Sequence, residues 1–220
     1  MALLGRYRHI AVEGPIGAGK SSLARKLAAH LGGDLLLEQA GENPFLERFY
    51  ADPAGYALQA QLAFLFQRLR QMQALAQPGM FAGGVVSDFM FAKDALFARL
   101  TLSDEEYALY ARLAAQAMAH PPEPDLVVWL QASPATLLRR IRARGLSMEQ
   151  GIAEEYLQRL CDAYVEHFHR HAGAPVLAVM TEEEQWLASR DKRPARGRAE
   201  LAKLVDASVY REALALGRKR

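Results

Sequence analysis

The stretch that decides the fold is EGPIGAGKSS, residues 13–22. Four of its residues fit the phosphate-loop pattern G-x-x-x-x-G-K-[ST]: Gly14, Gly19, Lys20 and Ser21. A buried-strand pattern precedes the stretch and a helical pattern, residues 20–31, follows it. In this order, backbone N–H groups of the turn and the helix N-terminus face a phosphate. The context favours a nucleotide site over a glycine-rich turn that binds nothing.

Short apolar runs alternate with helical patterns along the rest of the chain. The predicted strands are residues 7–12, 34–37, 85–87, 125–131 and 175–180. The predicted helices are residues 20–31, 56–75, 103–120, 134–144, 154–171 and 198–216. This alternation predicts an α/β fold of the P-loop NTPase type, a five-stranded parallel sheet with helices on both faces. We expect residues 1–220 to form a single domain.

Two acidic residues follow predicted strands, as the phosphate loop does. Glu38 comes after the second strand and Asp88 after the third. Ligands of open parallel sheets bind beyond the carboxyl ends of the strands. The three signals therefore predict one cleft, in which Lys20 neutralises the outer phosphates and Ser21 binds Mg²⁺. By themselves, these residues leave ATP and GTP equally possible.

The composition is that of an ordinary soluble enzyme. The chain has 220 residues, 51% of them hydrophobic, and a net charge of +2. The small charge argues against a nucleic-acid partner, and no apolar run approaches the about 18 residues of a membrane span. The single cysteine, Cys161, excludes an intrachain disulfide and favours a reducing compartment. We expect a cytoplasmic protein without a membrane partner.

The run LLRRIRARGLSMEQGIAEEYLQRL, residues 137–160, resembles the lid region of the deoxyribonucleoside kinases. In that family, arginines on a helix are followed by EQGI and EYL. EGPIGAGKSS resembles the family's phosphate loop, and WLQASP, residues 129–134, resembles the strand before the lid. The resemblance runs from about residue 7 to about residue 180. It implies a helical lid at about residues 140–152 and a homodimer. It also implies transfer of the γ-phosphate of ATP, with Mg²⁺, to the 5′-hydroxyl of a deoxyribonucleoside, and we expect a purine one, deoxyadenosine or deoxyguanosine.

The resemblance also implies which residues bind ATP and metal. The loop residues that would contact ATP are Gly14, Ile16, Gly17, Ala18, Gly19, Lys20, Ser21 and Ser22. Arg140 and Arg144, four apart on a helix, correspond to lid arginines that clamp the transferring phosphoryl group. Asp88 would hold Mg²⁺ beside Ser21.

The substrate residues come from the same resemblance. Glu38 corresponds to the general base that takes the proton of the 5′-hydroxyl. Tyr50 and Glu149 correspond to residues that hold the sugar 3′-hydroxyl. Gln61 corresponds to the residue that pairs with the base edge through its amide. The remaining base-pocket positions are Phe64, Arg68 and Asp94.

The sequence departs from the family pattern at two places. Phe89 follows Asp88 where the family has arginine, and Leu146 stands in place of a third lid arginine. Three explanations stay open: a cation from elsewhere replaces the arginine, the enzyme is slow, or the chain binds nucleoside without phosphorylating it. The candidate cations are Arg68, Arg70 and Lys93. The retained catalytic residues favour a working kinase; a thymidylate-like monophosphate kinase and a non-catalytic nucleotide-binding protein are the alternatives.

Overall fold

The computed structural model describes residues 7–77, 83–117 and 122–181. The predicted helix at residues 198–216 and the end of the predicted helix 103–120 lie outside these residues. None of the described helices is both long and apolar enough to cross a membrane.

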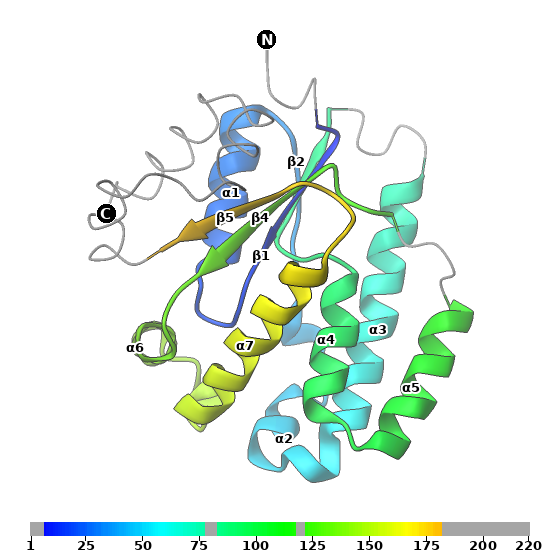
Figure 1. Cartoon of the computed structure of the whole chain (residues 1–220), viewed down its shortest axis with the longest axis vertical. Coiled ribbons are helices and arrows are strands. Elements are labelled where there is room, and N and C mark those ends of the chain that lie inside the picture. The colour runs from blue at the N-terminus through cyan, green and yellow to red at the C-terminus, as the bar shows by residue number, and fades with distance from the viewer. Residues whose placement is uncertain (1–6, 78–82, 118–121, 182–220) are drawn as a thin grey trace.

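A five-stranded parallel sheet forms the centre of the molecule (Figure 1). Its strands are β1 His9–Glu13, β2 Asp34–Leu36, β3 Val85–Ser87, β4 Leu126–Gln131 and β5 Val176–Met180. The strand order is β2-β3-β1-β4-β5, and β1 pairs with both β3 and β4. The predicted fold class and all five predicted strands are confirmed, with boundaries that differ by at most two residues.

Seven α-helices connect and follow the strands in the described parts of the chain. They are α1 Lys20–Leu31, α2 Leu46–Ala51, α3 Pro53–Ala76, α4 Ala92–Thr101, α5 Asp104–Ala117, α6 Pro134–Arg144 and α7 Glu154–Arg170. Two 3₁₀ turns, η2 Ala40–Glu42 and η3 Ser147–Glu149, complete the elements. Helix α5 begins with a capping box: the Glu106 N–H donates to Ser103 Oγ, and Glu106 Oε2 accepts from the Ser103 N–H.

The sequence analysis did not predict α2 and α4. Helix α2 is only six residues long, and α4 buries Lys93 and Asp94 together with Leu96 and Ala98. Charged residues on the buried face remove the apolar periodicity by which an amphipathic helix is predicted.

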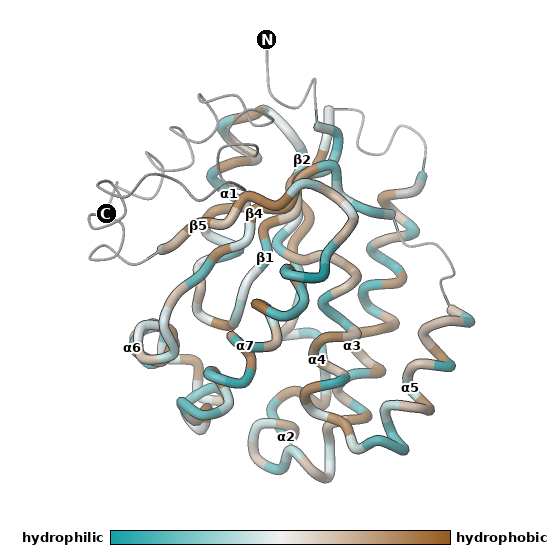
Figure 2. Tube along the Cα trace, viewed as in Figure 1, coloured by the Kyte–Doolittle hydropathy of each residue, from teal (hydrophilic) through white to brown (hydrophobic). Residues whose placement is uncertain are grey.

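Helices cover both faces of the sheet because alternate strand residues point to opposite sides. In β1, Ile10 and Val12 belong to a core formed with α1 and α6, while Ala11 belongs to a core formed with α4 and α7. Figure 1 shows α1 behind the sheet and α7 in front of it. Hydrophobic residues gather along the central strands, whereas α3 and α5 alternate hydrophobic and hydrophilic positions (Figure 2). The phosphate loop follows β1 at the middle of this sheet, between β3 and β4.

Candidate active site

The phosphate loop follows β1 and closes on the first turn of α1. Three of its glycines have positive φ: Gly14 at 148°, Gly17 at 84° and Gly19 at 96°. A Cβ on Gly14 would lie 2.5 Å from the Leu130 carbonyl oxygen, so a larger residue does not fit there. Lys20 Nζ donates to the Pro15 carbonyl oxygen at 3.0 Å, and its side chain therefore folds back over the loop. The other predicted loop residues differ in exposure: Ala18 is buried, Ile16 half-buried and Ser22 exposed.

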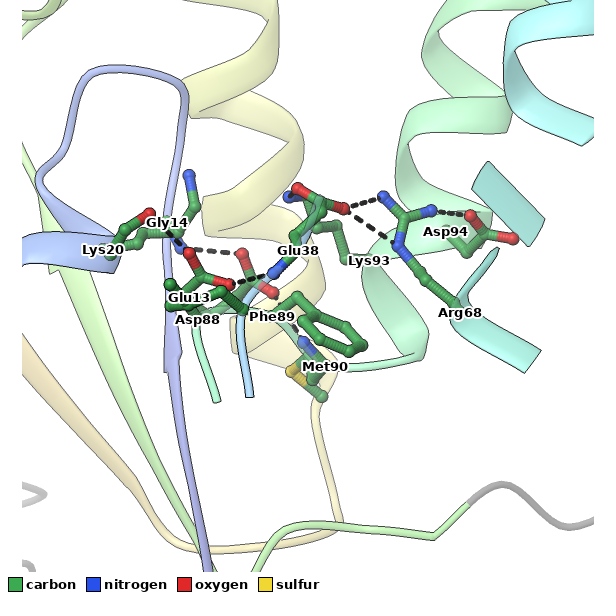
Figure 3. A network of polar contacts seen from close by, with 12 residues as sticks. Glu13, Gly14, Lys20, Glu38, Arg68, Asp88, Phe89, Met90, Lys93 and Asp94 are labelled. Atoms are coloured by element: carbon green, nitrogen blue, oxygen red, sulfur yellow. Dashed lines mark hydrogen bonds and ion pairs between the residues drawn. The ribbon is translucent and has the colours of Figure 1, made fainter. Parts of the chain in front are cut away.

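Glu13 anchors the start of this loop from inside the molecule. Its side chain is fully buried, and Oε1 accepts hydrogen bonds from the Gly14 N–H at 2.9 Å and the Tyr164 hydroxyl at 2.8 Å. Oε2 accepts from the Met90 N–H at 3.0 Å (Figure 3). One carboxylate thus joins the phosphate loop to α7 and to the segment after β3. The sequence analysis gave Glu13 no role, although a carboxylate directly after an apolar run was a usable signal.

The two predicted metal ligands meet at the end of the sheet. The Ser21 hydroxyl donates to Asp88 Oδ2, and the Glu38 backbone N–H donates to Asp88 Oδ1 at 2.6 Å. A hydroxyl and a carboxylate side by side are hard oxygen ligands, which Mg²⁺ prefers. Asp88 therefore lies between the phosphate loop and the predicted general base.

Glu38 lies between two buried cations. Its Oε1 accepts from Arg68 Nη2 at 2.5 Å and Nε at 3.1 Å, and its Oε2 accepts from Lys93 Nζ at 2.7 Å (Figure 3). Burial by itself would raise the pKa of Glu38. The charges of Lys93 and Arg68 outweigh burial and hold this pKa well below its usual range. Glu38 is therefore an ionised hydrogen-bond acceptor at every pH at which the protein is expected to work.

Arg68 also pairs with Asp94 on its other side. Arg68 Nη1 donates to Asp94 Oδ1, and the Tyr110 hydroxyl donates to Asp94 Oδ2. Arg68 and Asp94 are 2% and 1% exposed, and the Arg68 guanidinium lies 4.9 Å from the centre of the Phe64 ring. The structure thus brings together the predicted residues Phe64, Arg68 and Asp94. Tyr110 on α5 was not predicted.

Gln61 lies two helical turns before Arg68 on α3 and is 3% exposed. Its Nε2 donates to Thr101 Oγ1 at 3.1 Å. Its Oε1 is buried and has no hydrogen-bond partner within the described residues. One end of the amide is therefore fixed by the protein, and the other is left for a further donor.

The predicted sugar-binding residues lie near each other, where α2 packs against η3. Burial raises the pKa of Tyr50 well above its usual range, and the nearby Tyr156 and Glu149 raise it further. Glu149 is itself paired: its Oε2 accepts from Arg144 Nη2 at 2.5 Å and Nε at 3.1 Å. A predicted phosphoryl clamp and a predicted sugar ligand therefore form one ion pair.

The two predicted lid arginines have different partners, although they lie one turn apart on α6. Arg140 Nη1 donates to Thr181 Oγ1 and Nη2 donates to the Thr181 carbonyl oxygen, both at 2.8 Å. Arg140 is thereby anchored at the end of β5, and Arg144 is anchored on η3 through Glu149.

The two departures from the family pattern are also defined by the structure. The Phe89 ring is fully buried, and Leu146 is 40% exposed. Of the candidate replacement cations, Arg70 is exposed on α3, whereas Arg68 and Lys93 are buried against Glu38. Arg70 therefore cannot replace the missing arginine in this structure, and two candidates remain.

Comparison with known proteins shows the family to which the chain belongs. A family model described as deoxynucleoside kinase matches residues 10–199. Deoxyguanosine kinase of Bacillus subtilis (strain 168) is 33% identical over 156 residues, which are 70% of this chain and 75% of that protein. Deoxyadenosine/deoxycytidine kinase of the same organism is 31% identical over 182 residues, 79% of this chain and 82% of that protein.

A solved structure of deoxyadenosine kinase from M. mycoides with bound dATP has a TM-score of 0.70 and 25% sequence identity. The match covers 84% of this chain and 100% of that chain. The chain is therefore a phosphotransferase that belongs to the deoxynucleoside kinase family.

Proposed function

We propose that this deoxynucleoside kinase transfers the γ-phosphate of ATP to the 5′-hydroxyl of a purine deoxyribonucleoside, with Mg²⁺ bound by Ser21 and Asp88. The observation that carries the proposal is the position of Glu38. Its carboxylate lies between Arg68 and Lys93, and its backbone N–H contacts Asp88, which in turn contacts Ser21 of the phosphate loop. A base for the acceptor hydroxyl and a site for the donor phosphates are thus adjacent.

Glu38 acts on the 5′-hydroxyl by accepting its hydrogen bond and, as the P–O bond forms, its proton. Phosphoryl transfer has a loose transition state and needs positioning more than a strong base. A carboxylate with a depressed pKa therefore suits the reaction, provided that one of its two cations gives way to the hydroxyl. We propose that Lys93 is that cation and that it turns toward the transferring phosphoryl group, in the role that arginine at position 89 would otherwise have.

The phosphate side of the reaction uses fixed charges and dipoles. The phosphate loop and Lys20 would contact the phosphates of ATP, and a magnesium ion on Ser21 and Asp88 would neutralise part of their charge. Burial, with the neighbouring Lys93, lowers the pKa of Lys20 to about 8. We propose that residues 140–152 form a lid, from which Arg140 and Arg144 leave Thr181 and Glu149 to clamp the phosphoryl group.

On the nucleoside side, Gln61, Phe64, Arg68 and Asp94 would face the base, and Tyr50 and Glu149 the sugar 3′-hydroxyl. The named relatives support a purine substrate without agreeing on one base, since one is a deoxyguanosine kinase and another a deoxyadenosine/deoxycytidine kinase. We further propose a homodimer, to be tested by sedimentation velocity, and a cytoplasmic location, where ATP is available.

The test measures ADP release with ATP, Mg²⁺ and each of the four deoxynucleosides, beside the variant Glu38→Gln. We expect turnover with a purine deoxynucleoside and a loss of about 10²- to 10⁴-fold in kcat for Glu38→Gln. Turnover with pyrimidines alone would reject the purine substrate. Turnover with nucleoside monophosphates but not with nucleosides would identify the monophosphate kinase, and binding without turnover would identify a non-catalytic protein.

A further inference from the structure

We infer that Thr101 fixes the orientation of the Gln61 amide. In this orientation the pocket selects a base with an exocyclic amino group over one with a carbonyl at the same ring position. Among the purines, the selected base is adenine, which has an amino group at C6. The inference rests on the proposed function, in which Gln61 faces the base. It adds a positioning residue and a direction of base selectivity.

The orientation follows from what each atom can donate or accept. Thr101 is the last residue of α4, and its Oγ1 lies 2.7 Å from the Phe97 carbonyl oxygen, one turn back. A carbonyl oxygen only accepts, so the Thr101 hydroxyl hydrogen is directed to Phe97. Oγ1 can then only accept from the Gln61 atom at 3.1 Å, and that atom must be the amide nitrogen.

The opposite end of the amide is consequently an acceptor. Gln61 Oε1 is buried and has no hydrogen-bond partner in the described parts of the chain. A buried acceptor without a donor is unfavourable, so a ligand that brings an N–H group to this oxygen gains affinity. The second hydrogen of Nε2, which Thr101 does not use, is free to donate to the same ligand.

Adenine matches this pair of groups. Its 6-amino group donates to Oε1, and its N1 accepts from Nε2. Guanine and hypoxanthine present the reverse, an O6 acceptor and an N1–H donor, which would place acceptor against acceptor and donor against donor. To bind them equally well the Gln61 amide would have to flip, and the flipped Oε1 would then face Thr101 Oγ1, whose hydrogen is directed elsewhere.

The neighbouring charged groups are already paired with one another. Asp94 already accepts from Arg68 and Tyr110, one on each carboxylate oxygen. Arg68 in turn donates to Glu38 and Asp94. Of the residues proposed to face the base, Gln61 is the one whose amide oxygen is buried without a partner in the parts of the chain that the structure describes, and Thr101 decides which atom of the amide this is.

Deoxyadenosine and deoxyinosine test the inference because these nucleosides differ only at the edge concerned. We expect the wild-type protein to show a kcat/KM at least tenfold higher for deoxyadenosine. Thr101→Val keeps the shape but removes the acceptor, so the amide can flip and the preference should fall at least fivefold. Thr101→Ser keeps the hydroxyl and should keep the preference, which makes it the matched control.

Binding of both nucleosides by calorimetry is measured in parallel, so that a chain that binds without turnover still gives the ratio. Deoxynebularine has hydrogen at C6 and an acceptor at N1, so its kcat/KM with the wild type should fall between those of deoxyadenosine and deoxyinosine. This comparison needs no variant.

If only pyrimidines react, the proposed purine substrate is wrong, and a comparison of deoxycytidine with deoxyuridine tests the same amide. A wild-type preference for the carbonyl base, or an unchanged preference in folded Thr101→Val, overturns the inference.

Discussion

At the level of single residues, the site is a balance of buried charge. Glu38 is held by Arg68 and Lys93, and Arg68 is also held by Asp94. Buried ions are stable only when paired, because each pays a desolvation penalty of several kcal/mol. A nucleoside bound as proposed would therefore replace contacts that the free protein already makes. Lys93, with a single ammonium group, would give way more easily than Arg68, which bridges two carboxylates.

Lys93 provides the prediction at this scale. Lys93→Met keeps most of the side-chain volume but removes the charge, so we expect kcat to fall about 10²-fold, the typical cost of losing one preorganised contact to the transition state. Lys93→Arg keeps the charge and should lose less than tenfold. Both are measured with saturating ATP and nucleoside, beside thermal unfolding to show that the variants are folded. An unchanged kcat in Lys93→Met would mean that Arg68 alone replaces the missing arginine.

At the level of elements, the strands and the phosphate loop were predictable because their signals are local. Apolar runs, glycines and a following helical pattern predicted β1, the loop and α1. The position of Glu38 and Asp88 after two strands predicted that both lie in the cleft beside the loop. Helix α4 was not predictable in this way, because Lys93 and Asp94 lie on its buried face. Tyr110 contacts Asp94, and Thr101 contacts Gln61, only because α5 and α4 pack against α3. No local pattern in the sequence predicts that packing.

His9 of β1 gives a prediction about an element. Ser87 Oγ donates to the Phe89 carbonyl oxygen, so His9 Nε2 donates to Ser87 Oγ at 2.8 Å and joins β1 to β3. Burial lowers the pKa of His9 from 6.5 to about 4. The unfolded chain therefore binds a proton first as the pH falls, and the stability that neutral His9 provides is present above pH 6.5 and is lost progressively toward pH 4.

We expect the loss of unfolding free energy between pH 7 and pH 4.5 to be about 2 kcal/mol smaller in His9→Gln than in the wild type. Urea unfolding at each pH measures this difference. His169→Gln, at an exposed position on α7, should follow the wild type. Parallel pH profiles for His9→Gln and the wild type would show that folded His9 binds its proton over the same pH interval as the unfolded chain, so that burial does not lower its pKa.

At the level of the whole molecule, two groups of elements meet at Glu38 and Asp88. The loop after β1 and the start of α1 form the phosphate side, and α2, α3, α4 and η3 supply the residues proposed for the nucleoside. Contacts from Glu38 to Asp88 and from Asp88 to Ser21 connect the two sides. Although these contacts connect them, the two proposed sides use different residues, so each ligand should bind its own side and stabilise the molecule separately.

Thermal unfolding with ATP–Mg²⁺ alone, with the preferred nucleoside alone, and with both together tests this division. A ligand at a hundredfold excess over its Kd adds about 2.7 kcal/mol, which for a chain of this size raises Tm by about 5–10 °C. Lys20→Met removes the cation of the phosphate side only, so the shift with ATP should largely disappear while the shift with nucleoside remains. Gln61→Ala should give the opposite pattern. Loss of both shifts in either variant would mean that the two sides do not bind independently, and that the phosphate loop and the nucleoside pocket form one cooperative site.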